Sequence, residues 1–373
     1  MLPATLRIPA TGARSLLDEL RPASAKPDTR RRLTPLLALA GAGLITVLMV
    51  THGHQFVDAI ERALNTGWWP LALGAAFEAA SLAGYVLLLH HVVGRGSVRL
   101  RRRDSYDIAL GGTAATRLLP TAGLGGIAVA AWALRARGMR PHELTERLLA
   151  FLLLLYGVYA LGLLCGGTAV AFGLVPVSHG QTLGLIAIAL AVGVVATVVI
   201  VFARPAPVRA LLRRVGGGSG RFAPAAARGV EQLPVLRAAL QRSSRELLRP
   251  SPALLGALAS WGFDIGVLVV MLHAFGVSLP IGAVVLAYFL GTLLNLVPLP
   301  GSLSGGLAGA LIALGAPAAP AIAAVLAYRA IAVWLPAASG IASLASLRAS
   351  VAGWRAESAT GAATRTAGSQ FAV

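Results

Sequence analysis

The sequence predicts an all-α integral membrane protein with about six full transmembrane helices and two re-entrant, broken helical hairpins in an inverted repeat. Of the 373 residues, 57% are hydrophobic and only 12% are charged, with a mean hydropathy of +0.76. Soluble domains carry about 25% charged residues. Most of the 32 Lys and Arg residues fall between apolar segments or at the termini, as the positive-inside rule expects. In addition, prolines and glycines interrupt two apolar regions where unbroken helices would otherwise be expected.

The N-terminal part predicts a basic leader followed by two spans. Residues 1–32 are rich in Pro, Arg and small residues, which indicates a flexible cytoplasmic leader. The apolar run 33–50 lacks a clear small-residue cleavage site, so we expect an uncleaved anchor. Trp68 and Trp69 then mark a membrane interface, where Trp is enriched, and a second span runs to about residue 94.

The first broken segment lies between two arginine-rich loops. The segment from Asp107 to Leu119 contains 13 residues and the segment from Gly123 to Leu134 contains 12, whereas a full span needs roughly 20. These lengths predict a re-entrant hairpin that opens to the cytoplasm. Two short, tilted full spans are the alternative, and loop charge does not separate the two topologies.

Two further spans, 148–172 and 182–203, lead to the largest loop. This cytoplasmic loop, 204–250, holds ten Arg against two Glu and contains the segment 230–248, whose pattern predicts a basic amphipathic helix lying on the membrane. The loop divides the chain into two halves.

The second half repeats the plan of the first. A span at 252–275 precedes the uncharged region 281–315, which contains the sequence Asn295-Leu-Val-Pro-Leu-Pro-Gly301, and a last span follows at 317–347. We expect 351–373 to be a disordered cytoplasmic tail, which places both termini in the cytoplasm and bounds the transmembrane domain at 33–350. The two repeats are about 68–173 and 252–347. Because the second hairpin opens outward by charge, the repeats are inverted, as in many secondary transporters.

Four ionisable residues fall inside predicted membrane segments: Glu78, Arg117, Asp264 and Arg329. Arg or Asp costs about 2.5–3.5 kcal/mol at the bilayer centre, so each requires a partner or a wet cavity. Glu78 and Asp264 occupy equivalent positions in the two repeats. They are candidate coupling or structural acids. The two arginines are predicted to bind an anionic lipid head group, because a guanidinium matches phosphate bidentately. The alternative is that they neutralise the two acids in buried pairs.

Backbone amides at the two breaks would add donors at half-helix N-termini. The complete set of predicted head-group residues is Arg117, Arg329, Gly123, Gly125, Gly126, Gly301, Gly305, Gly306, Asn295 and Tyr328. The sequence suggests no catalytic constellation, no metal site, no cofactor and no nucleic-acid partner, so we do not expect an enzyme.

Several ordered motifs resemble the flippase-like membrane family that includes the lysylphosphatidylglycerol synthase transmembrane region. The motifs are Trp261-Gly-Phe-Asp264, Ala274-Phe-Gly276, Pro298-Leu-Pro-Gly301, Tyr328-Arg329 and Trp334-Leu-Pro336, with Leu119-Pro120 and Gly123-Leu-Gly-Gly126 in the first half. The resemblance implies a multi-pass protein of the bacterial plasma (inner) membrane that moves phospholipid or polyprenyl-linked lipid between leaflets. The family commonly has an acidic residue near the position of Leu307, and the chain lacks the soluble aminoacyl-transfer domain of bifunctional members.

These observations favour a lipid translocator for an anionic phospholipid or a polyprenyl-phosphate-linked lipid. One alternative is a membrane-embedded transferase acting on a lipid-linked donor. Another is a non-catalytic partner that anchors a lipid or cell-envelope enzyme through the loop 204–250. Membrane lipids are the expected partners, together with a second copy of the chain or an envelope-biosynthesis enzyme.

Overall fold

The computed structural model of the protein describes residues 67–118, 124–177, 180–203, 205–217, 223–293 and 302–370. Within these ranges the regular structure is helical, and the β-type pairing is an isolated bridge between Arg95 and Arg99. The predicted leader and the predicted first span, 33–50, lie outside the described residues, as do the proline-containing centres of both breaks.

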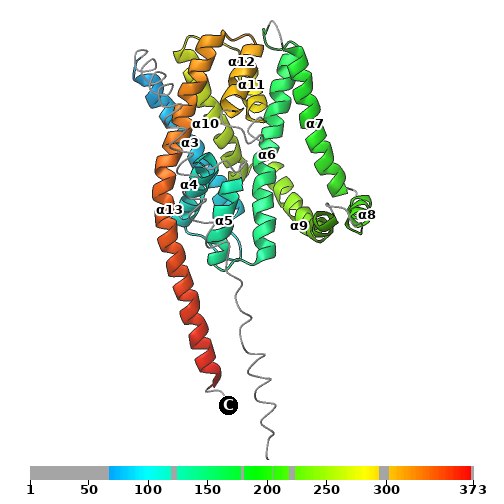
Figure 1. The fold of residues 1–373 in the computed structure, drawn as a ribbon, viewed down its shortest axis with the longest axis vertical. Helices are drawn as coiled ribbons and strands as arrows, with labels where there is room; N and C mark the ends of the chain where they lie inside the picture. The colour runs from blue at the N-terminus through cyan, green and yellow to red at the C-terminus, as the bar shows by residue number, and fades with distance from the viewer. Residues whose placement is uncertain are drawn as a thin grey trace, which may run out of the picture. The chain divides into compact units, whose positions relative to one another are not determined.

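The described helices match most of the predicted segments. In chain order they are α3 (Trp69–Val92), α4 (Arg102–Leu118), α5 (Leu124–Ala136), α6 (Pro141–Ala171), α7 (Gln181–Ala203), α8 (Pro205–Gly216), α9 (Ala223–Leu247), α10 (Pro252–Ala274), α11 (Ile281–Leu293), α12 (Ser302–Ala313) and α13 (Ala318–Gln370), as labelled in Figure 1. Five are long and apolar enough to cross a membrane: α3, α6, α7, α10 and the part of α13 up to Glu357. The prediction of an all-helical membrane protein is confirmed for the described residues.

Local sequence signals set the ends of the long helices. Pro141 and Pro252 lie in the first turns of α6 and α10, where the missing N–H has no intrahelical partner to lose. Ser251 caps α10 by accepting a hydrogen bond at 3.1 Å from the backbone N–H three residues later. Gly173 and Gly276 follow the ends of these helices with φ of 68° and 74°, a left-handed conformation that glycine adopts without strain. The lengths of both spans are therefore encoded at their own termini.

Helices α3 and α10, one from each predicted repeat, cross in close antiparallel contact. A Cβ on Gly84 would lie 2.8 Å from the Gly256 carbonyl oxygen, and one on Gly256 would lie 2.7 Å from the Gly84 carbonyl oxygen. One turn away, the Ser81 hydroxyl donates a hydrogen bond of 2.8 Å to the Ser260 carbonyl. Such close approach of two membrane helices requires small residues at the crossing. This contact joins the two halves of the chain and fixes which side chains of α3 and α10 face each other.

The two pairs of short helices lie beside different parts of α13, α11 and α12 near its start and α4 and α5 near its middle. In Figure 1, α11 and α12 lie toward the upper end of the helices and α4 and α5 toward the lower end. Near its middle, α13 meets α4 closely: a Cβ on Gly340 would lie 2.5 Å from the Leu110 carbonyl oxygen, and Ser346 donates a hydrogen bond of 2.8 Å to Asp107. At the start of α13, Ala321 and Ala324 belong to the apolar core that α11 and α12 also form.

Helix α13 continues beyond residue 350, where the sequence predicts a disordered tail, and ends at Gln370. Contacts with the end of α5 hold the first turns of this part of the helix. The Arg137 guanidinium lies 5.1 Å from the ring centroid of Trp354 and 3.4 Å from a Glu357 carboxylate oxygen. Trp354 is buried as a result, although the residues around it are exposed.

The predicted loop 204–250 contains helices α8 and α9. Helix α9 includes the segment predicted to be amphipathic and packs against α6, where Ala239 is buried. Arg242 anchors the packing, because its Nε and Nη2 both donate to one Glu146 oxygen, at 3.0 and 2.8 Å.

Candidate functional site

The charged residues of the membrane segments gather where α3, α4, α10 and α13 meet. Glu78 lies one turn from Ser81 on α3, and Asp264 lies one turn from Ser260 on α10, so the α3–α10 crossing turns the two acids toward each other. Arg117, in the last turn of α4, is within electrostatic range of both acids. Arg329 on α13 is also within range of both. The structure thus brings together four residues that the sequence analysis selected separately.

Asp264 is held by two tyrosines. The Tyr328 hydroxyl lies 3.2 and 3.1 Å from the two carboxylate oxygens, and the Tyr288 hydroxyl donates to Oδ2 of the same group. All three side chains are buried. A buried carboxyl group is costly without hydrogen-bond partners, and the two phenols provide them for Asp264 and hold its side chain in place.

These contacts give one predicted residue a partner and add another residue to the site. Tyr328 is predicted to contact the lipid head group, and in the structure its hydroxyl donates to Asp264. Tyr288 was missed by the sequence analysis. It is a lone phenol in the apolar helix α11, and a buried Tyr hydroxyl usually needs a partner, which is the signal that could have identified it.

Glu78 differs from Asp264 in having no such donors. Its side chain has 0% exposure, and within the described residues neither of its oxygens has a hydrogen-bond partner of normal geometry. Its neighbour across the crossing is the Asp264 carboxyl, which lies near enough to interact with it. A buried carboxylate without donors is costly, so Glu78 is the less stable of the two as an anion.

Arg117 and Arg329 form no direct ion pair with Glu78 or Asp264 among the described residues. The ion pairs between described residues are Arg137–Glu357, Arg147–Glu143 and Arg242–Glu146, and none involves Arg117 or Arg329. In addition, Nη1 of Arg329 is buried without a hydrogen-bond partner among the described residues. Among the described residues, the structure therefore shows no direct ion pair between these arginines and the two acids, and Nη1 of Arg329 remains available to another anion.

An aromatic cluster from α6, α10 and α11 borders the acid pair. Trp261 packs edge-on against Tyr159, Tyr288 and Phe289, with ring centroids 5.5, 6.1 and 5.7 Å apart. The Trp261 indole N–H donates to the Leu155 carbonyl of α6 at 2.9 Å. Because Trp261 and Asp264 share one face of α10, this packing fixes the side of α10 that faces the charged residues. In the motif Trp261-Gly-Phe-Asp264, Trp261 therefore fixes the orientation of α10 by packing, and Asp264 supplies the acid.

The predicted backbone donors divide into three groups. Gly123, Asn295 and Gly301 lie outside the described residues. Gly126 uses its N–H within the α4–α5 pair, donating to the Thr116 hydroxyl at 2.8 Å, and a Cβ there would lie 3.0 Å from the Gly112 carbonyl oxygen. Gly125 also lies in a buried position on α5. Gly126 is therefore a packing residue, and its amide is engaged within the protein.

The glycines of α12 are arranged differently. Gly305 is exposed, and a Cβ added there would meet nothing within 4 Å, while Gly306 is partly buried. Leu307 is fully buried, and a Cβ on Gly291 of α11 would lie 2.5 Å from its Cα. The position near which the family commonly has an acid is thus occupied by a packing residue in this chain.

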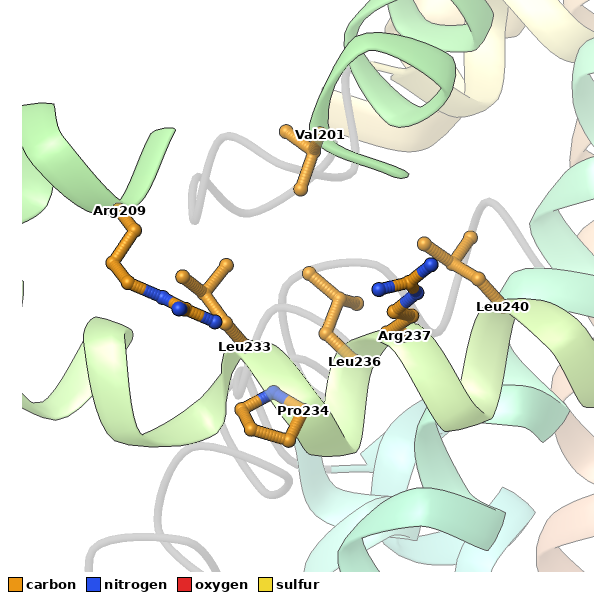
Figure 2. A pocket seen from close by; sticks show the side chains of 7 residues that line it. All are labelled: Val201, Arg209, Leu233, Pro234, Leu236, Arg237 and Leu240. Carbon is orange, nitrogen blue, oxygen red and sulfur yellow. The ribbon is translucent and has the colours of Figure 1, made fainter. Parts of the chain in front are cut away.

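A hollow lies apart from the charged cluster, among α7, α8 and α9. It encloses about 130 Å³, and Figure 2 shows the seven lining side chains. These are Val201, Arg209, Leu233, Pro234, Leu236, Arg237 and Leu240. The apolar lining with two arginines suits a surface that faces lipid. No three His, Cys, Asp or Glu side chains gather as metal ligands within the described part of the chain.

Comparison with known protein families identifies the fold. The family described as lysylphosphatidylglycerol synthase TM region matches residues 36–340. The chain belongs to this family. The resemblance seen in the ordered motifs is thereby confirmed, and membership makes the chain a multi-pass membrane protein tied to lipid or envelope biosynthesis. No curated protein matches the chain.

Proposed function

We propose that this member of the lysylphosphatidylglycerol synthase TM region family moves an anionic phospholipid or a polyprenyl-phosphate-linked lipid between the leaflets of the bacterial plasma membrane. The observation that carries the proposal is that Arg117 and Arg329 lie near the α3–α10 crossing and form no direct ion pair with another described residue. A phosphate head group would supply the acceptors that Arg329 Nη1 lacks among the described residues.

The lengths of the short helices support a route for the head group. Helices α4, α5, α11 and α12 have 17, 13, 13 and 12 residues. At 1.5 Å per residue they extend about 18–25 Å, less than the roughly 30 Å of a hydrocarbon core. We infer that each pair forms a re-entrant hairpin, α4–α5 from the cytoplasmic side and α11–α12 from the outer side. Both termini are then cytoplasmic.

Alternating access follows from this arrangement. The hairpin of one repeat would open a path to one leaflet while the other hairpin closes its own, as in transporters built from inverted repeats. The close α3–α10 contact would serve as the joint between the repeats. Lipid tails would remain in the bilayer, so that only the head group passes the charged cluster. No covalent chemistry is required of the protein, and we propose no enzymatic step.

Translocation in reconstituted vesicles tests the proposal. The lipid would be a fluorescent phosphatidylglycerol or a fluorescent polyprenyl phosphate, with phosphatidylcholine as the neutral comparison. We expect Arg329→Gln to slow transport of the anionic lipid roughly ten- to hundredfold, because it removes charge-assisted hydrogen bonds of about 1.5–3 kcal/mol. Arg348→Gln is the matched control, since Arg348 is exposed on the same helix. Equal rates for the two variants would disprove the site assignment.

The alternative of an anchoring partner has one supporting observation, the basic hollow of α8 and α9 in Figure 2. It predicts the opposite dependence: Arg209→Gln would abolish function in cells, while Arg117→Gln and Arg329→Gln would be tolerated.

A further inference from the structure

The acid pair at the α3–α10 crossing has the features of a proton-binding site. Asp264 accepts hydrogen bonds from Tyr288 and Tyr328, whereas the fully buried Glu78 has no partner for either oxygen within the described residues. Two buried carboxylates that face each other repel when both are ionised, so such a pair readily accepts one proton. The difference in donors makes Glu78 the acid that would accept it.

Every charged or titratable group near the pair comes from one of five helices. Glu78 belongs to α3 and Asp264 to α10, and Arg117 faces them from the end of α4. Tyr288 of α11, and Tyr328 and Arg329 of α13, complete the set. Two guanidinium charges balance two carboxylate charges when the acids are ionised. The formal charge of the cluster is then zero.

We propose that Glu78 takes up one proton when an anionic head group binds to Arg117 and Arg329, so that the anion and the proton bind together. The inference rests on the proposed function for the identity of the anion. A bound phosphate monoanion draws on the two guanidinium charges and adds a negative charge to a buried cluster. One proton on the acid pair restores neutrality, and Glu78 receives it because it has no hydroxyl donors to lose.

Because the proton and the anion bind together, each changes the affinity of the protein for the other, and both changes can be measured. If one proton accompanies each anion, the affinity for the anion falls by up to tenfold for each unit that the pH rises. The same anion must then raise the affinity of the pair for the proton by an equal factor. A role for Glu78 in packing alone produces neither effect.

The experiment uses the full chain in detergent with short-chain phosphatidylglycerol as the anionic probe and short-chain phosphatidylcholine as the neutral one. Binding is followed by calorimetry, and proton uptake by a pH-indicator dye in weakly buffered solution. We expect uptake approaching one proton per bound phosphatidylglycerol and none with phosphatidylcholine. Infrared difference spectra should show a protonated carboxyl band that appears with the anionic lipid.

Two variants decide where the proton goes. Glu78→Gln mimics the protonated acid, so we expect tight binding that no longer depends on pH, with no proton uptake and no new carboxyl band. Asp107→Asn is the control, because Asp107 is a buried acid on α4 that accepts a hydrogen bond from Ser346 away from the cluster. It should behave like the wild-type protein. Uptake that persists in Glu78→Gln overturns the assignment.

The outcomes also separate this inference from the proposed function. Failure of wild-type protein to bind phosphatidylglycerol in preference to phosphatidylcholine would contradict the proposed head-group site. Preferential binding without proton uptake would contradict only the coupling. Binding that requires Na⁺ and is independent of pH would contradict proton binding and would indicate that a metal cation occupies the acid pair.

Discussion

The α3–α10 crossing gives the most quantitative prediction about stability. Replacing Gly256 by Ala places a Cβ 2.7 Å from both the Gly84 carbonyl oxygen and the Leu88 nitrogen. These are backbone atoms, so no side chain can rotate away, and the helices must separate. Overpacking of this kind costs about 1–3 kcal/mol. Gly262→Ala on the same helix is the matched control, because its Cβ would meet nothing within 4 Å.

The comparison cancels the effect of helix propensity. Ala is favoured over Gly in a helix by up to about 1 kcal/mol, and both substitutions lie within α10. The difference between the two variants therefore reports the clash, and we expect Gly256→Ala to be less stable than Gly262→Ala by about 1–3 kcal/mol. Unfolding by SDS titration, followed by tryptophan fluorescence, measures this difference. Equal stabilities would refute the close crossing and with it the juxtaposition of the two acids.

Three further predictions concern other contacts. Tyr288→Phe removes a hydroxyl donor from Asp264 and should lower stability by about 1–3 kcal/mol in the same titration; an unchanged midpoint would contradict the hydrogen bond. Leu307→Ala should lower it by about 2–5 kcal/mol, because the side chain is fully buried against Gly291, and a loss below 1 kcal/mol would argue against that packing. Arg242→Gln should leave global stability within about 1 kcal/mol but increase hydrogen exchange in α9, whereas unchanged exchange would show that the ion pair does not hold that helix.

Composition and charge placement were enough to predict the helical membrane fold. Apolar runs of sufficient length identify the spans directly, because a bilayer leaves few other structures for an uncharged segment of that length. The limited length of the first broken segment likewise predicted that the helices α4 and α5 are short. The equivalence of Glu78 and Asp264 also followed from sequence, because both lie about midway along corresponding spans.

The partners of those residues could not be predicted from the sequence. Whether Arg117 meets an acid, a lipid or a backbone carbonyl depends on how α4 crosses α3, α10 and α13, which no local pattern encodes. Tyr288 illustrates the same limit, since its hydroxyl reaches Asp264 from another helix. The order of α13 beyond residue 350 depends on Trp354 and Arg137, which are distant in sequence. These features depend on contacts between helices that are distant in sequence, which local sequence patterns do not reveal.

A structure of the full chain bound to phosphatidylglycerol in a lipid nanodisc would show whether Arg117 and Arg329 bind the lipid head group. We expect phosphate density within hydrogen-bonding distance of both guanidinium groups, with Arg329 Nη1 among the donors. That density should be lost in Arg329→Gln and retained in Arg348→Gln. Phosphate density confined to the hollow of Figure 2, or direct ion pairs of both arginines with Glu78 and Asp264 in the presence of lipid, would rule out this head-group site.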